Sequence, residues 1–251
     1  MRRDVLELRD FYAGPLGAAA REVLARKLEE AWGDARDLDV LGLGYATPWL
    51  EGVRATARRT VAAMPASQGV EVWPGEGRTL ATLVEESTLP FMNALFDRVL
   101  IVHGLEESDD PVRMLQEVWR VLAPSGRVII AAAARSGVWC RAEHTPFGHG
   151  RPFTRGQLER LVREAELEPF AWSRALYVPP MALFAGWAEG FEQTGSRLWP
   201  PFAGLILLEA VKQTFAVKPQ RVRQRLRVLA PAGVAQPARA GKLLAKDGSP
   251  T

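Results

Sequence analysis

Short apolar runs alternate with helical periodicity through the middle of this chain, and few folds accommodate that alternation. Residues 80–84, 97–102 and 126–132 have the length and composition of buried strands. Residues 111–122 carry apolar side chains at a spacing of about 3.6 residues, which indicates a helix. Strands joined by crossover helices form parallel sheets with right-handed connections. The alternation therefore predicts an α/β fold with a mainly parallel sheet.

A glycine-containing turn in the sequence DVLGLGYATPW, residues 39–49, precedes this region. Its apolar start predicts a strand, and Gly42 and Gly44 predict a turn. Thr47 and Pro48 then suit the N-cap and first residue of a helix, whose free N–H groups can bind a ligand. The third glycine of a dinucleotide-binding fingerprint is missing, because Thr47 stands three residues after Gly44. Taken alone, the turn either binds a nucleotide or only joins a strand to a helix.

Proline and glycine mark the remaining boundaries. A helical pattern before the turn is broken at Gly14 and Pro15, and residues 65–78 contain too much proline and glycine for a crossover helix. That helix is predicted to be shortened or lost. The resulting organisation is a leading helical segment (1–37), an α/β domain (38–218) with an apolar insertion near 177–203, and a basic tail (219–251).

Basic charge is concentrated in the tail. Seven basic residues and one acidic residue follow position 220, whereas the net charge of the whole chain is +3. The tail has little apolar surface to offset its chain entropy, so we expect it to be disordered. A solvated extension is the first interpretation and contact with an acidic partner is the second; no feature clearly predicts nucleic-acid binding.

Cysteine usage and hydropathy indicate the compartment. Cys140 is the single cysteine, so no internal disulfide can form and a reducing environment is expected. No signal peptide is apparent, and the apolar stretches at 181–187 and 202–208 are far shorter than the roughly 20 residues that cross a bilayer. We therefore expect a cytoplasmic protein without a transmembrane segment.

Four pieces of sequence follow one another between residues 89 and 167: LPF, FDRVLIVHGLE, DDPVRMLQEVWRVLAPSGRVII and PFTRGQLERLVREAEL. In this order and spacing they resemble the region around the fourth strand of class I S-adenosylmethionine-dependent methyltransferases of the methyltransferase-11 type. The resemblance spans residues 39–167. It implies a Rossmann-like methyltransferase fold, with a mainly parallel, doubly wound seven-stranded sheet and helices on both faces, and S-adenosylmethionine as the cofactor.

The resemblance also implies the cofactor contacts. In the family these lie in the turn after the first strand, at the ends of the second and third strands, and just after the fourth. The corresponding positions are Gly42, Gly44, Tyr45, Met64, Glu85, Glu86 and His103. A solvated pair at a strand end is the alternative for the two glutamates, and a structural histidine is the alternative for His103.

Two acidic positions of the family lack an acid in this chain. The residue two before Gly42 is Val40, and the second strand ends in Met64 and Pro65 instead of the carboxylate that holds the ribose. Ala46 replaces the third glycine of the turn. Loss of two charge-assisted hydrogen bonds, at about 1.5–3 kcal/mol each, predicts cofactor binding weaker by roughly 100-fold or more.

These departures leave two main functions open. The first is a methyltransferase with an unidentified acceptor, and the second is a pseudo-methyltransferase that acts as a binding or scaffolding protein. Methyl transfer from a sulfonium depends largely on alignment and proximity, so missing catalytic side chains do not argue against activity. A nicotinamide-dependent reductase would need an acid near the end of the second strand. We expect the methyltransferase.

The acceptor site is expected near the segment after the fifth strand. His144, His149 and Arg151 in this segment are the candidate substrate contacts, and a packed surface turn is the alternative. The two histidines are five residues apart with no carboxylate or thiol at ligand spacing, so no metal site is predicted. The acceptor stays open between a small molecule, a lipid or quinone, and a protein, and the oligomeric state is not defined.

Overall fold

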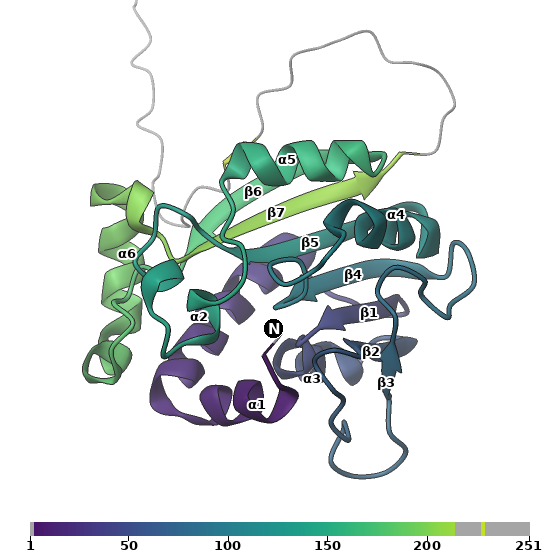
Figure 1. Ribbon diagram of the computed structural model, residues 1–251, viewed down its shortest axis with the longest axis horizontal. Helices are drawn as coiled ribbons and strands as arrows, with labels where there is room; N and C mark the ends of the chain where they lie inside the picture. The colour runs from purple at the N-terminus through teal and green to yellow at the C-terminus, as the bar shows by residue number, and fades with distance from the viewer. Residues whose placement is uncertain (1–2, 214–226, 229–251) are drawn as a thin grey trace, which may run out of the picture.

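The computed structural model describes residues 3–213 and 227–228. Its strands form one sheet in the order β3-β2-β1-β4-β5-β7-β6-β8 (Figure 1). They are β1 (Asp39–Gly44), β2 (Arg59–Pro65), β3 (Ala81–Val84), β4 (Phe96–Val102), β5 (Leu122–Ala133), β6 (Leu167–Ala175), β7 (Leu205–Lys212) and the two-residue β8 (Arg227–Val228). Only β7 runs antiparallel to its neighbours. The predicted seven-stranded, mainly parallel sheet is confirmed, and β8 extends it at the β6 edge.

Helices cover both faces of this sheet, as predicted. One hydrophobic core joins a face to α1, α2 and α3, and a second joins the opposite face to α4 and α5. The helices are α1 (Val5–Ala13), α2 (Pro15–Trp32), α3 (Thr47–Arg54), α4 (Pro111–Val121), α5 (Arg155–Glu164) and α6 (Ala188–Leu198). Side chains alternate between the two cores along β1, with Val40 in the first and Leu41 in the second.

The leading helices are built as the sequence predicts. Asp4 caps α1 by accepting a hydrogen bond from the Leu6 backbone N–H. Gly14 ends α1 and precedes α2, whose first residue is Pro15. Buried residues of both helices belong to the same core as β1 and β4. The leading segment is therefore packed onto the sheet.

The connection between β2 and β3 contains no helix, which confirms the predicted loss of a crossover helix. The helix after β1 is α3, which spans Thr47–Arg54. After it, the Arg58 backbone N–H donates to the Leu38 carbonyl oxygen and the Arg58 guanidinium pairs with Asp39 beside the start of β2. Thr47 is the first helical residue and not the N-cap, which is Ala46.

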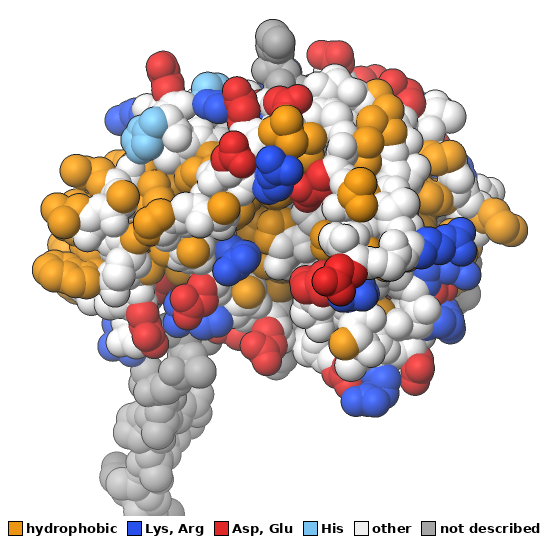
Figure 2. Space-filling view, turned by 90° about the horizontal axis from the view of Figure 1, so that it is seen from below, with side chains coloured by type: hydrophobic (Ala, Val, Ile, Leu, Met, Phe, Trp, Pro, Cys, Tyr) orange, Lys and Arg blue, Asp and Glu red, His pale blue; other side chains and the backbone are white. Residues whose placement is uncertain are grey.

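The insertion between β6 and β7 contains α6 and two short 3₁₀ segments, η3 (Ala182–Trp187) and η4 (Pro200–Phe202). Hydrophobic side chains gather on the left of Figure 2, the side on which Figure 1 shows α6. Within the described residues, no helix is long and apolar enough to cross a membrane. The predicted tail, residues 219–251, lies outside the described residues except for β8.

Candidate functional site

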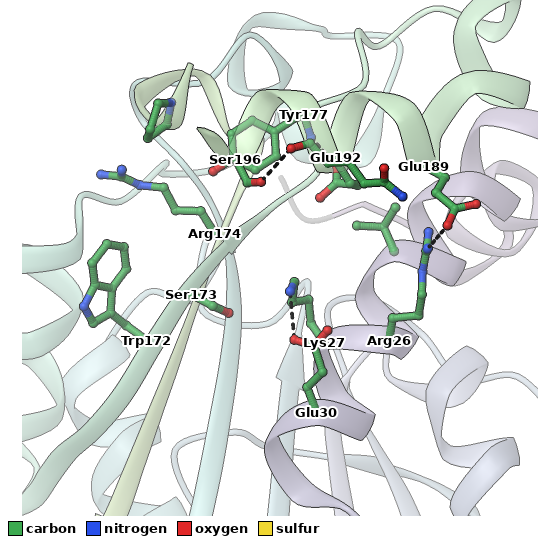
Figure 3. Close-up of a pocket in the computed structure, with 13 residues that line it drawn as sticks. Arg26, Lys27, Glu30, Trp172, Ser173, Arg174, Tyr177, Glu189, Glu192 and Ser196 are labelled. Carbon is green, nitrogen blue, oxygen red and sulfur yellow. Dashed lines mark hydrogen bonds and ion pairs between the residues drawn. The ribbon is translucent and has the colours of Figure 1, made fainter. Parts of the chain in front are cut away.

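A hollow of about 550 Å³ lies between α2, β6 and α6 (Figure 3). Four of its charged side chains form two ion pairs, Arg26 with Glu189 at 3.6 Å and Lys27 with Glu30 at 2.8 Å. Glu192 accepts a hydrogen bond from the Tyr177 backbone N–H at 2.5 Å, and its burial raises its pKa. None of the residues predicted to bind the cofactor lines this hollow.

The carboxyl ends of β1, β2, β3 and β4 lie at one edge of the sheet, because these strands are parallel and adjacent. In open α/β sheets, ligands bind at this edge. Most of the predicted cofactor contacts lie at or just beyond these strand ends: Gly44, Tyr45, Met64, Glu85, Glu86 and His103. The structure thus brings together residues that are spread over about sixty positions of sequence.

Gly44 forms the turn at the end of β1. It has a φ of 86°, in the left-handed region, and a Cβ on it would lie 2.2 Å from the Val102 carbonyl oxygen. The next backbone N–H, of Tyr45, donates to that same oxygen at 2.8 Å. Only glycine fits between the ends of β1 and β4, so this part of the turn prediction has a clear physical basis.

Gly42 has a different role from the one expected. It lies inside β1, and a Cβ on it would be 2.7 Å from both the Ala46 Cβ and a methyl group of Leu50. Its space is taken by α3 and is not open to a ligand. The acidic position of the family, two residues before Gly42, is Val40, whose side chain is buried in the core.

Met64 does not face an open site either. Its side chain is fully buried in the core shared with α1, α2 and α3. The predicted absence of a carboxylate from the end of β2 is correct for the strand. A carboxylate is nevertheless close to the strand end, because the loop after β2 brings Glu71 to the start of α3.

Glu71 accepts a hydrogen bond from the Thr47 hydroxyl at 2.9 Å. The carboxylate also helps to raise the pKa of the adjacent Tyr45, although burial is the larger cause. It is half-buried at the same sheet edge as the Gly44 turn. Sequence reasoning missed Glu71, because residues 65–78 were interpreted only as a lost helix. An acid close after the second strand was the available signal.

His103 follows β4 and is buried, with a φ of 49° that is uncommon for a residue with a side chain. Its Nε2 lies 2.6 Å from the Tyr12 hydroxyl of α1. Burial lowers the pKa of His103 to about 3 and raises that of Tyr12 well above its usual value. Both groups are therefore neutral near pH 7 and share one hydrogen bond.

Aromatic rings close the edge around this pair. Tyr12 stacks on Tyr45 with ring centroids 5.7 Å apart, and Phe147 lies 4.7 Å from the His103 ring. The cavity left beside His103 has a volume of about 10 Å³, no more than one water molecule needs. Tyr12 and Phe147 were not identified from the sequence, because they reach this edge from distant segments.

Polar contacts hold α1 against the rim. The Arg3 backbone N–H donates to Glu107 at 2.9 Å, and the Arg3 guanidinium donates to the Glu143 carbonyl oxygen and contacts His149. The Val5 backbone N–H donates to the carbonyl oxygen of Gln68, whose side-chain amide donates to that of His103. The N-terminal helix is thus fastened to the ends of β2 and β4.

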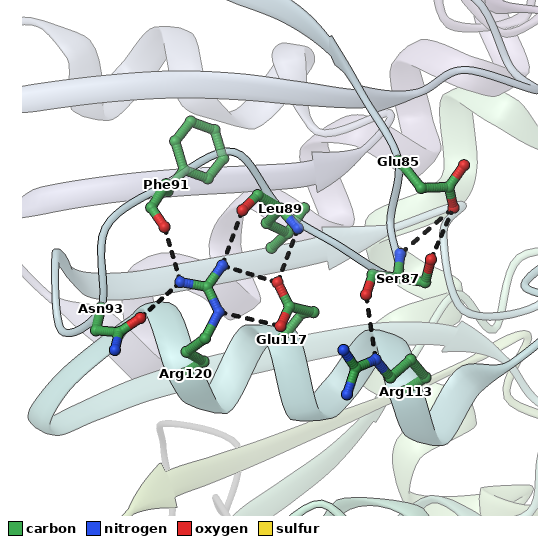
Figure 4. A network of polar contacts seen from close by, with 8 residues as sticks. All are labelled: Glu85, Ser87, Leu89, Phe91, Asn93, Arg113, Glu117 and Arg120. Carbon is green, nitrogen blue, oxygen red and sulfur yellow. Dashed lines mark hydrogen bonds and ion pairs between the residues drawn. The ribbon is translucent and has the colours of Figure 1, made fainter.

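Glu85 and Glu86 are at the end of β3. Glu85 is exposed, and its carboxylate accepts a hydrogen bond from the Ser87 hydroxyl at 3.1 Å. The LPF segment that follows is anchored to α4 (Figure 4): buried Glu117 accepts from the Leu89 backbone N–H at 2.8 Å, and Arg120 donates to Leu89, Phe91 and Asn93. This network fixes the loop that carries both glutamates.

The three residues predicted to contact the acceptor lie in different surroundings in the structure. His149 lines the small cavity beside His103, so it reaches the site. His144 Nε2 lies 2.7 Å from the Pro180 carbonyl oxygen, which ties its loop to the insertion. Arg151 is exposed, and its backbone N–H donates to Glu106. Within the described residues, no group of three or more His, Cys, Asp or Glu residues could hold a metal ion.

The cofactor implied by the family fits part of this edge. The Gly44 turn allows close backbone approach, and Glu71 supplies a carboxylate beside it. The ring of Tyr12, however, covers Tyr45 and His103. The fold and this edge define the class: the strand order and ligand edge are those of class I S-adenosylmethionine-dependent methyltransferases.

Comparison with known proteins shows which of them the chain resembles. Residues 38–130 match the family model of a methyltransferase domain, the methyltransferase-11 type. Demethylmenaquinone methyltransferase of Thermus thermophilus is 37% identical over 92 residues, which are 37% of this chain and 35% of the relative. The match thus spans about a third of that relative's length.

Solved structures agree with the fold. A S-adenosylmethionine-dependent methyltransferase from Thermotoga maritima superposes with a TM-score of 0.62 and 18% identity, covering 83% of this chain and 96% of that one. A second, from Archaeoglobus fulgidus, has a TM-score of 0.55 and 13% identity, covering 76% and 94%. The similarity extends well beyond residues 38–130 and includes most of the sheet.

Proposed function

We propose that this protein transfers a methyl group from S-adenosylmethionine to a small apolar or lipid acceptor in the cytoplasm. The observation that carries the proposal is the Gly44 turn, held against the end of β4 within a methyltransferase domain. When bound, the cofactor supplies an electrophilic methyl group on a sulfonium. The free Cys140 supports a reducing compartment. The name of the Thermus relative supports a lipid quinone as one acceptor to test.

The chain's own residues position and shield the reactants. The Gly44 turn would allow the backbone to approach the cofactor, and the Glu71 carboxylate would accept hydrogen bonds from the ribose hydroxyls in place of the missing acid on β2. Thr47 orients that carboxylate through their 2.9 Å hydrogen bond. Tyr12, Tyr45 and Phe147 exclude water from the strand ends, which favours direct transfer between aligned reactants.

Binding at this edge requires Tyr12 to leave His103. The break between α1 and α2 at Gly14 supplies a place where α1 can pivot. Cofactor affinity is then reduced by the fraction of molecules in which α1 is closed. We therefore expect a dissociation constant of roughly tens of micromolar or weaker, as the missing acid on β2 also implies.

Calorimetric titration with S-adenosylmethionine and S-adenosylhomocysteine tests the proposal. Glu71→Gln should weaken binding about tenfold, because one charge-assisted hydrogen bond is lost. Glu76→Gln is the matched control, since Glu76 is an exposed acid in the same loop. Formation of S-adenosylhomocysteine with a demethylated quinone would identify turnover. Absence of binding at millimolar cofactor would contradict the proposed activity.

A further inference from the structure

The insertion between β6 and β7 exposes an unusual set of side chains. Six of the thirteen exposed large hydrophobic side chains of the described residues lie on it, and we call these six the insertion face. They are Met181, Leu183, Trp187, Leu198, Trp199 and Phe202. Leu183 is 80% exposed and Trp187 is 69% exposed, so their apolar surface is almost fully in water. Such a concentration marks an interaction surface.

The backbone of the insertion presents these side chains outward. Neither η3 nor η4 buries any of its residues. Behind them, Phe184 packs against Phe191 of α6 with ring centroids 5.8 Å apart, so the turns rest on a packed base. In Figure 2 the hydrophobic side chains gather at the end of the molecule that carries α6 in Figure 1. The insertion face is therefore a supported apolar projection.

The chain combines this projection with a strongly basic sequence after residue 220. β8 runs parallel to β6 and pairs Val228 with Trp172, three residues before β6 ends and the insertion follows. The chain from residue 221 onward contains seven basic residues and one acidic residue. Arg197, next to Leu198 on α6, is exposed and makes no ion pair within the described part of the chain. The chain from residue 221 onward thus adds basic sequence to a protein whose insertion face is apolar.

We propose that the insertion face docks on a lipid surface that carries anionic headgroups. Tryptophan and phenylalanine side chains suit the boundary between headgroups and acyl chains, and both exposed tryptophans of the described chain are on this face. Stable anchoring of a protein on a bilayer generally takes two signals, here an apolar projection and a basic segment. Docking of a second copy of the chain would need only the apolar projection and would leave the basic segment without a role.

Vesicle sedimentation of the full chain tests this, with phosphatidylcholine vesicles and with vesicles that also contain phosphatidylglycerol. The combined variant Leu183→Ser, Trp187→Ser and Phe202→Ser should lower partitioning into anionic vesicles at least about tenfold, since about 1.4 kcal/mol of lost burial gives this factor. The control is Val72→Ser with Met92→Ser, which removes equally exposed side chains outside the insertion and should change nothing. Arg239→Ser with Lys242→Ser and Lys246→Ser should reduce binding to anionic vesicles alone.

Three results would overturn the proposal: no vesicle binding by the natural chain, equal binding by the triple variant, or a dimer in light scattering that the triple variant converts to monomer without any vesicle binding. The last result would assign the face to a second copy. Melting temperatures check that each variant folds, and Leu183→Ser alone serves if the triple variant does not. No cofactor is present, so the outcome is independent of methyl transfer.

Discussion

The hydroxyl of Tyr12 and Nε2 of His103 share a 2.6 Å hydrogen bond, across 91 positions of sequence. This bond joins the N-terminal helix to the residue that follows β4, at the edge where the cofactor is expected. It closes the site and also satisfies a buried imidazole. The two roles have opposite consequences for stability and for ligand binding, which makes them separable.

Tyr12→Phe should tighten cofactor binding while it weakens the fold. The variant keeps the ring but loses the hydroxyl, so α1 opens more readily, and a bond of about 0.5–1.5 kcal/mol corresponds to roughly 2- to 12-fold tighter binding. Leaving His103 unpaired should lower the melting temperature by a few degrees. Calorimetry and thermal unfolding measure the two effects. Tyr177→Phe, at a half-buried tyrosine on the insertion side, is the control, and equal or weaker binding by Tyr12→Phe would contradict gating.

Acidification should destabilise the protein through His103. Its folded-state pKa of about 3 lies below the ordinary value of 6.5, so the unfolded chain binds the proton first. Stability is therefore lost as the pH falls from about 6.5 toward 3, by up to about 1.4 kcal/mol per unit. Between about pH 7 and pH 5 this residue should account for about 2 kcal/mol.

Melting curves of His103→Gln and His144→Gln at both pH values check this effect. The first variant should lose the corresponding part of the pH dependence. The second should keep it, because His144 is exposed. An unchanged pH dependence in His103→Gln would show that other groups control acid sensitivity.

Glu117 should matter far more than a similar acid on the surface. Hydrogen bonds from Arg120 lower the pKa of this buried carboxyl, so its contribution is present above its unfolded-state pKa and is lost as the pH falls through the lower folded-state value. Glu117→Gln should cost about 1–3 kcal/mol near pH 7. The control is Glu51→Gln, which breaks an exposed pair with Arg54 at the same spacing and should cost less than about 0.5 kcal/mol. Similar losses in urea unfolding would refute the anchoring role of Glu117.

Substitution of alanine at two glycines close together in sequence should change the free energy of unfolding in opposite directions. Gly44→Ala places a methyl group 2.2 Å from a backbone oxygen in a left-handed conformation, and we expect a loss of more than about 2 kcal/mol. Gly52→Ala is on α3 with no atom within 4 Å of the added carbon, and it should gain roughly 0.5–1 kcal/mol. Chemical unfolding of both variants tests the pair, and a tolerated Gly44→Ala would mean that the turn is looser than described.

Periodicity and turn chemistry predicted much of the fold. The apolar runs around β4 and β5 and the helical pattern of α4 have strong local signals, and the capping box of Thr154 and Gln157 is present at α5. The start of β5 was missed because its first residues, from Leu122, follow α4 without a loop and carry a turn-like Pro-Ser-Gly sequence. Local patterns find elements better than their boundaries.

The site was predicted less completely, because its contacts are long-range. The strand ends were located correctly, yet Tyr12 and Phe147 reach His103 from segments with no local signal for that contact. Gly42 was assigned to the ligand because the sequence shows two glycines but not that Ala46 and Leu50 occupy the space beside the first. Side-chain crowding of this kind depends on the packing of α3 and not on the motif.

The missing helix between β2 and β3 has an evolutionary consequence. Because no helix joins β2 to β3, the loop between them brings Glu71 to Thr47, so the carboxylate is on the loop and not on the strand. We therefore expect loss of the helix and the position of the carboxylate to change together among related proteins. Homologues that retain a full crossover helix should keep an acid at the end of the second strand, whereas those with a shortened crossover should carry a loop acid at the position of Glu71. The two acids should replace one another across lineages.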